Sequence, residues 1–351
     1  MKIKFAILPL ILVSISVLTG CNPSQPNTKI KVSFGSLVDT EYTNISYGDL
    51  YQKVNYEESM VVTTYPGKDT TCSCWRTFEY VLNDYVKAKE AIIYAVDALE
   101  IQGKYNDFGL VVSDKDPSIA FFKDGKLVEQ IVYSVKNERS FFKNSVDFIN
   151  FMDEKIIQPD LLYVNQTYLT NAHNNHETFV IAHTYSSCSD CSYVVPNVLM
   201  PYTTSKTLTT KVWIIDLNDI HADISAWQSY KDQWNLSNVN NETYGYNSGY
   251  VPTFQYYNQG VLSSSSVFFN DTIAYDEATS TFKVADSFYT EERKNNLSYI
   301  QGVENNVIKG ITLPIDQLDL YPEYNYIAWK HEYARMYHEP LLKAFLDTYS
   351  K

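Results

Sequence analysis

Residues 184–196 read TYSSCSDCSYVVP and place two cysteines, Cys188 and Cys191, on either side of a Ser-Asp pair. The chain has 351 residues and only five cysteines, so a close pair is a notable use of a rare residue. Such a pair can be half of a metal site, a structural disulfide, or a dithiol that opens and closes. A structural disulfide stabilises a fold mainly by constraining a long loop of the unfolded chain. Because this pair closes almost no loop, stability explains it poorly.

The segments around the pair alternate between strand and helix patterns. Residues 178–184 are short, apolar and β-branched, which predicts a buried strand, and the cysteines are followed by helical spacing. Beyond the pair, the expected elements are a helix at 192–200, a strand at 211–217, a helix at 222–234, a proline loop at 251–253, an aromatic strand ending at Gly260, and a return strand at 266–274.

This order resembles the thioredoxin superfamily, and the resemblance covers residues 175–275. The dithiol falls at a strand-to-helix junction, and Pro196 stands where the active-site helix of that family carries a kinking proline. Pro252 stands in the loop where the family holds a cis-proline facing its disulfide. The resemblance implies an α/β fold, with a central mixed sheet flanked by helices, and a redox site made of Cys188, Cys191 and Pro252.

The first half of the chain repeats the layout with a different cysteine motif. A strand is expected at 58–65 and a strand-to-helix junction at Cys72-Ser73-Cys74, followed by a helix at 76–89 and a strand at 91–98. Gly125 follows Pro117 by as many residues as Gly260 follows Pro252. Tandem thioredoxin-like domains therefore account for both halves, and Cys72, Cys74 and Pro117 are the corresponding site residues of the first.

The Cys-Ser-Cys motif leaves three interpretations open. Aligning Cys74 with Cys191 puts Thr71 at the nucleophile position and Cys74 at that of the resolving thiol. The motif is then a second, more oxidising redox couple, a vestigial site in a binding domain, or two thiols that never pair. Trp75 is either a substrate platform or a core aromatic.

The predicted domain borders follow from these repeats. They are a signal peptide at 1–20, a lipidated cysteine and tether at 21–40, a first domain at 41–157, and a second domain at 158–351 with an insertion at about 285–328. A helix at 140–155 is expected to close the first domain, and 158–170 to join the two. Pro340 is expected to begin the helix that closes the second domain.

The N-terminus predicts export and lipidation. Two lysines within 1–4 precede an apolar run at 5–18, which is too short to span a bilayer comfortably and has the layout of a secretory signal. The run ends in Leu18-Thr19-Gly20-Cys21, which resembles the lipobox of bacterial lipoproteins. This resemblance implies cleavage before Cys21 and its lipidation, including palmitate, on the extracytoplasmic face of the cell membrane. The alternative is an ordinary signal peptide cut near the same place.

The chemistry of the second pair follows from its expected place at a helix N-terminus, where unpaired N–H groups favour a thiolate. Cys188, the more exposed thiol, is expected to attack a substrate disulfide and Cys191 to resolve the mixed disulfide. Asp190 raises the Cys188 pKa, which predicts a mildly reducing or isomerase-like couple. Ala182 stands where thioredoxins carry an acid, and His183 beside it is either a base or a structural histidine pointing to the other face.

Metal binding is the competing interpretation of the pair. Structural zinc sites need four ligands, and the chain has one Cys-x-x-Cys, with His173 and His176 expected at the far end of the strand. Copper delivery by Cys188, Cys191 and His183 is a variant of the same idea.

Three functions are therefore carried forward. The first is a membrane-anchored extracytoplasmic thiol–disulfide oxidoreductase that acts on disulfides of exported proteins and draws electrons from a membrane thiol reductant. The second is a surface lipoprotein whose thioredoxin-like domains are binding modules, and the third is copper or zinc delivery. No cofactor is expected. The net charge of −13 argues against a nucleic-acid partner.

Overall fold

The structure is a computed structural model that describes residues 29–67, 72–137, 139–236, 240–241, 245–246, 251–268, 307–308, 311–312 and 326–351. The signal peptide, Cys21, Thr71 and most of the predicted insertion lie outside these residues. Within the described ranges, no helix is both long and apolar enough to cross a membrane.

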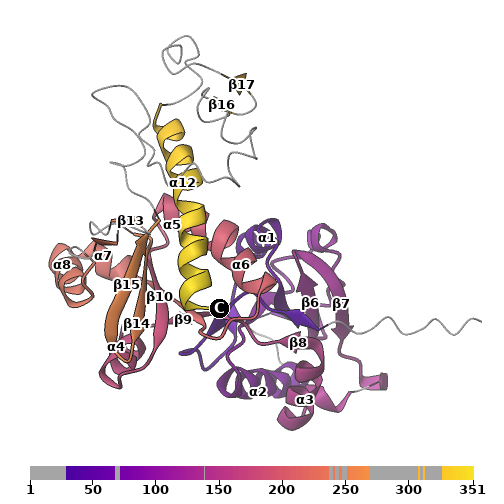
Figure 1. Cartoon of the computed structure of the whole chain (residues 1–351). Coiled ribbons are helices and arrows are strands. Elements are labelled where there is room, and N and C mark those ends of the chain that lie inside the picture. The colour runs from indigo at the N-terminus through magenta and orange to yellow at the C-terminus, as the bar shows by residue number, and fades with distance from the viewer. Residues whose placement is uncertain are drawn as a thin grey trace, which may run out of the picture.

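The first domain is built on a five-stranded sheet of order β3-β5-β4-β6-β7, of which Figure 1 labels the neighbouring strands β6 and β7. Strands β3, β5 and β4 are parallel, and β6 and β7 form an antiparallel hairpin beside β4. Its elements are β3 (Thr43–Asn44), α1 (Tyr47–Asn55), β4 (Met60–Tyr65), α2 (Ser73–Ala88), β5 (Ile93–Asp97), β6 (Ser118–Lys123), β7 (Lys126–Val132) and α3 (Ser145–Lys155).

The second domain repeats this order, with one strand added at the edge. Its sheet runs β15-β14-β10-β11-β9-β2, with β9, β11 and β10 parallel and β14 and β15 antiparallel. Its elements are β2 (Gly35–Ser36), β9 (Leu161–Val164), α4 (Gln166–Asn174), β10 (Phe179–Thr184), α5 (Ser189–Val194), η4 (Val195–Leu199), α6 (Met200–Ser205), β11 (Val212–Asp216), α7 (Asn218–Ala222), α8 (Ile224–Gln233), β14 (Thr253–Asn258), β15 (Val261–Val267) and α12 (Tyr326–Tyr349). Both sheets have the strand order and directions of the thioredoxin fold, so the predicted α/β fold with two tandem thioredoxin-like domains is confirmed.

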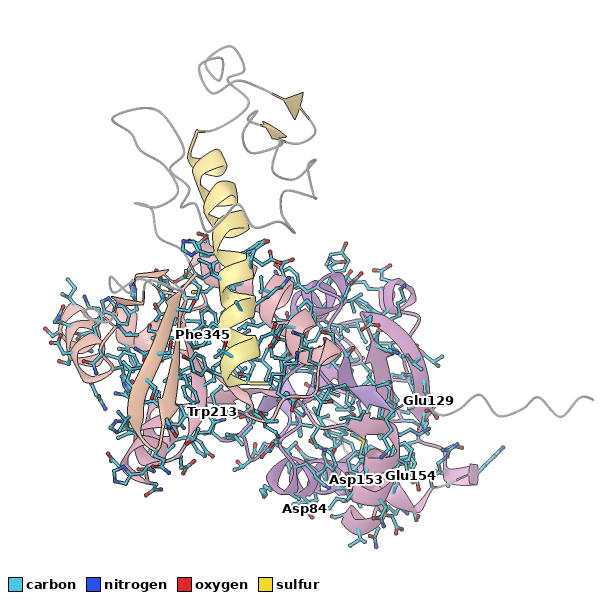
Figure 2. The ribbon with its side chains drawn as sticks, in the orientation of Figure 1. Asp84, Glu129, Asp153, Glu154, Trp213 and Phe345 are labelled. Atoms are coloured by element: carbon cyan, nitrogen blue, oxygen red, sulfur yellow. A yellow bond between two sulfur atoms is a disulfide. The ribbon has the colours of Figure 1, made fainter. Side chains whose placement is uncertain are left out.

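The central strands explain why the sequence folds in layers. Every residue of β4 and of β10 is buried, as expected for strands covered on both faces by helices. Alternation along β11 sends Trp213 and Ile214 into different buried clusters, one on each face of the sheet. Phe345 of α12 belongs to the same cluster as Ile214, so α12 covers the face opposite Trp213 (Figure 2).

The hairpin turns come from a local left-handed backbone. Asp124 and Gly125 both have positive φ (49° and 71°), as do Gln259 and Gly260 (51° and 74°). Two successive left-handed residues make the tight turn that matches strand twist. The return strand of the second hairpin therefore begins at Val261, so the start predicted for it at 266 is wrong, and residues 269–274 of that prediction lie outside the described residues.

The N-terminal segment corrects the predicted tether. Residues 30–36, which were assigned to the tether at 21–40, are built into the fold: β1 (Ile30–Lys31) pairs with β8 (Ile156–Ile157), and Gly35–Ser36 pairs with β9. Val32 and Phe34 are buried, and that burial holds the segment in place. The predicted linker at 158–170 is also wrong, because it contains β9 and the start of α4.

The closing helix differs from prediction at its start. Helix α12 runs through Pro340 instead of beginning there. An internal proline costs about 3 kcal/mol through a lost hydrogen bond and a clash. Leu342, Phe345 and Leu346 are fully buried just after it, and each such burial stabilises by about 1.5–3 kcal/mol. Burial of these three side chains therefore outweighs the free-energy cost of the proline inside the helix.

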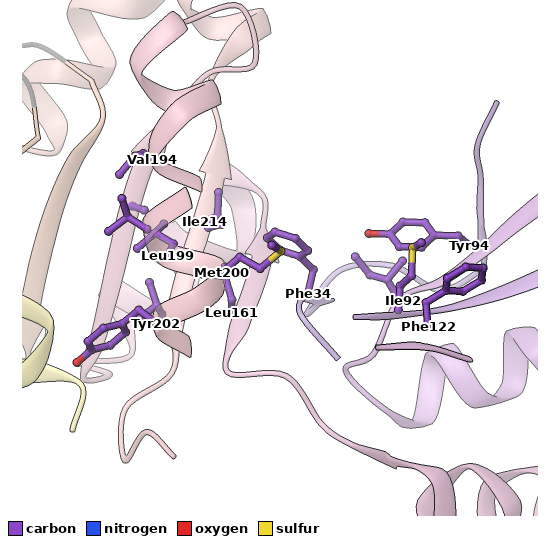
Figure 3. Packing of buried hydrophobic residues seen from close by; sticks show 14 of the residues in the cluster. Phe34, Ile92, Tyr94, Phe122, Leu161, Val194, Leu199, Met200, Tyr202 and Ile214 are labelled. Carbon is purple, nitrogen blue, oxygen red and sulfur yellow. The ribbon is translucent and has the colours of Figure 1, made fainter. Parts of the chain in front are cut away.

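The two domains share a buried core. Phe34 lies between Met200 of the second domain and Ile92 and Tyr94 of the first (Figure 3), and it stacks on Tyr163 with ring centroids 5.6 Å apart. Two ion pairs, Lys31–Asp160 and Lys211–Glu90, also join residues far apart in the sequence. The segment leading into the first domain thus helps to fix the second against it.

Candidate functional site

The dithiol of the second domain lies where β10 ends and α5 begins. Cys188 is the residue that caps α5, and its Sγ accepts a hydrogen bond from the Cys191 backbone N–H at 3.3 Å. Both thiols are free, with Cys188 9% exposed and Cys191 3%. The structure therefore places the two sulfurs at the predicted junction, with Cys188 the more accessible of two largely covered groups.

The predicted proline loop faces this pair. The Val251–Pro252 peptide bond is cis, and Val251 belongs to one buried group with both cysteines. The Cys188 thiol donates to the Val251 carbonyl oxygen at 3.6 Å. Pro252 is thus adjacent to the dithiol, although the two are far apart along the chain.

The two thiols differ in acidity. The Cys188 pKa is lowered to about 7, first by a hydrogen bond from the Cys191 thiol and then by the backbone N–H groups of Cys191 and Asp190. Burial and the Asp190 carboxylate oppose this shift. Asp190 therefore acts in the predicted direction, but the hydrogen bonds from the Cys191 thiol and from the two backbone N–H groups outweigh it. The Cys191 pKa is raised, because its proton is held by the Cys188 sulfur and because the thiol is buried.

His183 takes the structural role. Its ring nitrogens are 2.9 Å from the Tyr230 hydroxyl and 2.9 Å from the Gln255 side-chain oxygen, and the residue is completely buried. Burial lowers its pKa to about 4, which keeps the ring neutral. With both nitrogens occupied, the ring is not a base for the dithiol.

The histidines proposed as metal ligands lie elsewhere. His173 and His176 contact Gly260, at the turn that ends β14 away from Thr253. Among the described residues there is no group of three or more His, Cys, Asp or Glu side chains placed to hold a metal ion.

The first domain carries its cysteines differently. Cys72 and Cys74 form a disulfide at the start of α2, which disagrees with the interpretation as unpaired thiols. The Cys74 sulfur lies 3.8 Å from the Lys115 carbonyl oxygen. Pro117 precedes β6 as Pro252 precedes β14, but the bond before Pro117 is trans. Trp75 is 6% exposed and stacks on Tyr65 at 5.0 Å, so it is a core aromatic.

The structure adds a cavity between the domains that the sequence did not predict. Its volume is about 690 Å³, and Cys191 and Pro196 line it from the second domain. From the first domain it is lined by Lys53, Glu58 and Tyr94. Glu58 is 4% exposed and lies 3.2 Å from the Lys53 ammonium, and its pKa is raised by burial. The cavity brings a buried carboxyl group of one domain to the space beside Cys191 of the other.

Three aromatic residues beside the dithiol were also missed. Tyr185 and Trp227 both pack against the group formed by Cys188, Cys191 and Val251. His221 stacks on Tyr185 at 4.1 Å and approaches Trp227 at 5.2 Å. Tyr185 lies inside the quoted cysteine stretch, but no pattern in the sequence links it to residues of α7 and α8.

The sequence matches no protein-family model and no curated protein. Among solved structures, a mutant thioredoxin from Halobacterium salinarum is 15% identical over 34% of this chain and 93% of its own, with a TM-score of 0.26. Human ERp44 is 12% identical over 62% of this chain and 49% of its own, with a TM-score of 0.31. ERdj5 is 15% identical over 64% of this chain and 25% of its own, with a TM-score of 0.26. The chain therefore spans half or less of the length of ERp44 and of ERdj5. The fold assignment itself rests on the strand order and register given above.

Proposed function

We propose that this protein is a thiol–disulfide oxidoreductase that works through Cys188 and Cys191. The observation that carries the proposal is the free thiol of Cys188 at the N-terminus of α5, with a pKa lowered to about 7 and the Val251–Pro252 loop against it. At neutral pH about half of such a thiol is present as the nucleophilic thiolate.

The reaction runs in two balanced steps. The Cys188 thiolate attacks one sulfur of a substrate disulfide, forming a Cys188–substrate disulfide and releasing the other substrate sulfur as a thiolate. Cys191 then loses its proton and attacks the Cys188 sulfur, forming the Cys188–Cys191 disulfide and releasing the second substrate thiolate. The substrate disulfide gains two electrons, and the dithiol loses two. A thiol reductant returns them to the enzyme.

The redox potential expected of the Cys188–Cys191 couple favours reduction or isomerisation of substrates. A thiolate that is strongly stabilised favours the reduced enzyme and so makes a strong oxidant. Here the pKa of Cys188 is lowered only to about 7, because burial and Asp190 oppose the hydrogen bonds from the Cys191 thiol and from the backbone N–H groups of Cys191 and Asp190. A redox titration with a glutathione buffer tests this: a potential well above that of glutathione would reject a reducing role.

The proposed setting is the outer face of a cell membrane. The apolar run at 5–18 and the Leu18-Thr19-Gly20-Cys21 sequence support export and lipidation at Cys21. The substrates are then exported proteins with disulfides, and the electron donor is a membrane thiol reductant. Cys21→Ser is expected to move the protein from the membrane fraction to the soluble fraction, and a variant that stays on the membrane contradicts the anchor.

The test of the activity is reduction of insulin by the full mature chain. Cys188→Ser is expected to abolish turnover, because it removes the thiol that caps α5, and the cysteine that caps α2, Cys72, is joined to Cys74 in a disulfide. Ser229→Ala, an exposed change on α8, is the matched control and is expected to behave as wild type. Turnover retained in Cys188→Ser would reject the proposal and favour a binding module. Stoichiometric copper or zinc in the purified protein would favour metal delivery.

A further inference from the structure

We propose that the Tyr185 hydroxyl donates a hydrogen bond to the Cys188 sulfur and is a further catalytic residue of this site, held in position by His221. The inference rests on the proposed function, since it assigns a role within the same dithiol reaction.

The position of Tyr185 follows from the end of β10. The strand ends at Thr184, so Tyr185 is the first residue of the turn that leads to Cys188. Its side chain packs against the buried group of Cys188, Cys191 and Val251. A phenol O–H beside a thiolate is a charge-assisted donor, and bonds of that type are stronger than neutral ones.

The ring of Tyr185 is held from its other face. His221 stacks on it with ring centroids 4.1 Å apart and an interplanar angle of 23°. His221 in turn lies 5.2 Å from Trp227, which packs against the same cysteine group. The three rings form an arc, and the rings at its two ends, Tyr185 and Trp227, both pack against the group of Cys188, Cys191 and Val251. Rotation of Tyr185 away from Cys188 would therefore break the stack, so the hydroxyl is fixed in place before substrate arrives.

The phenol remains a donor over the range in which the thiol ionises. The pKa of Tyr185 is raised, first by burial and then by the negative charge of the Cys188 thiolate. The hydroxyl is consequently protonated whenever Cys188 is a thiolate near neutral pH. It can stabilise that thiolate before attack on substrate, and again when a reductant opens the Cys188–Cys191 disulfide and Cys188 leaves as a thiolate.

Tyr185→Phe is the direct test, because it keeps the stacked ring and removes only the donor. The readout is the pH dependence of Cys188 alkylation by iodoacetamide in the reduced full chain, with the modified sulfur identified by tandem mass spectrometry. Loss of a hydrogen bond to a charged group is expected to raise the midpoint by roughly half a unit to one unit. Insulin reduction at pH 7 is expected to slow by a few-fold, with the thermal midpoint of the protein unchanged.

Two further variants make the result specific. Tyr80→Phe makes the same chemical change at a side chain that is 74% exposed on α2, and it is expected to leave both readouts unchanged. His221→Leu removes the stacking partner and is expected to shift the midpoint in the same direction by less. An unchanged midpoint in Tyr185→Phe, with Cys188→Ser still inactive, would overturn this inference and leave the proposed function standing. Full activity in Cys188→Ser would instead remove the proposed function, and this role with it.

Discussion

The two domains have the same strand order, the same turn chemistry and a helix starting at the same junction, yet their cysteines are set differently. The Cys188 sulfur accepts a hydrogen bond from the Cys191 N–H at the start of α5, whereas the Cys72 side chain makes no capping hydrogen bond to α2 and is bonded to Cys74. Pro252 follows a cis bond and Pro117 a trans bond. The comparison teaches that the fold supplies a place for chemistry, while individual contacts at that place decide whether chemistry follows.

The largest difference between the two domains is expected in how much mixed disulfide with substrate each one traps. Cys191→Ser leaves the Cys188 nucleophile without its resolving thiol, so a mixed disulfide with substrate is expected to accumulate nearly completely. Cys74→Ser is expected to trap almost none, because the Cys72 sulfur is not held by the helix N-terminus. Non-reducing electrophoresis with a disulfide-containing substrate measures both. Equal trapping by the two variants would show that both domains are active.

Acid is expected to weaken the second domain before the first. His183 has its pKa lowered to about 4 from an ordinary 6.5, so between those values the unfolded chain holds a proton that the folded chain does not. The stability from this site is complete above pH 6.5 and declines by roughly 2–3 kcal/mol as the pH falls to 4. His338 of α12, with its pKa lowered by burial to about 3, acts in the same direction.

The first domain has no counterpart to this effect. The residue of β4 that corresponds to His183 of β10 is Thr64, because Thr64 pairs with Ser118 as His183 pairs with Thr253. All six histidines of the chain follow residue 172, so none lies in the first domain. Hydrogen exchange, corrected for intrinsic rates, is therefore expected to show β10 losing protection before β4 as pH falls from 7 to 4.5. In His183→Leu the protection of β10 should depend less on pH, although the variant is less stable at pH 7. Equal losses in β4 and β10 of the wild type would contradict this account.

Alkylation is expected to distinguish the two thiols of the second domain. The pKa of Cys188 is lowered to about 7, so its thiolate forms as the pH rises through that value, and below it the rate falls about tenfold per pH unit. Cys191, whose pKa is raised, should stay unmodified at neutral pH. Iodoacetamide labelling followed by peptide mapping measures both. Equal labelling of the two cysteines at pH 7 would be inconsistent with the site as described.

The smallest effect on the rate of insulin reduction is expected from removing the Cys-Ser-Cys motif of the first domain. The double variant Cys72→Ala/Cys74→Ala should reduce insulin within about twofold of the wild-type rate, because the Cys188 site does not need the other disulfide for either step. The reaction is run with excess dithiothreitol as the reductant. A loss greater than tenfold would indicate that electrons pass between the domains, and an interdomain disulfide should then be found in the Cys191→Ser chain.

Prediction from sequence worked where the signal was local. The apolar runs of β4 and β10, the helical face of Phe78, Val81, Leu82 and Tyr85, and the glycines of both hairpins are short-range features. It failed for β3, β9 and residues 30–36, because elements of two to four residues carry no measurable periodicity. It also failed at Pro340, where burial of the following side chains outweighs a local helix-breaking signal.

Prediction of the candidate site likewise succeeded for local features and left open the roles that depend on distant residues. Cysteine spacing and the loop prolines identified Cys188, Cys191 and Pro252 as one constellation, and the structure brings them together. The roles of His183 and Trp75 were left open, since each depends on partners distant in the sequence. Tyr230 and Gln255 decide the first, and Tyr65 decides the second.

The sequence by itself determined where the sulfurs lie relative to strand, helix and turn, because those relations depend on backbone preferences within a few residues. Only the tertiary structure decided that the N-terminal segment joins the two domains, that Glu58 and Cys191 share a cavity, and that Tyr185 is held between Cys188 and His221. Each of these relations requires closing a long stretch of chain, and the favourable contacts that offset that entropy come from burial across the whole fold.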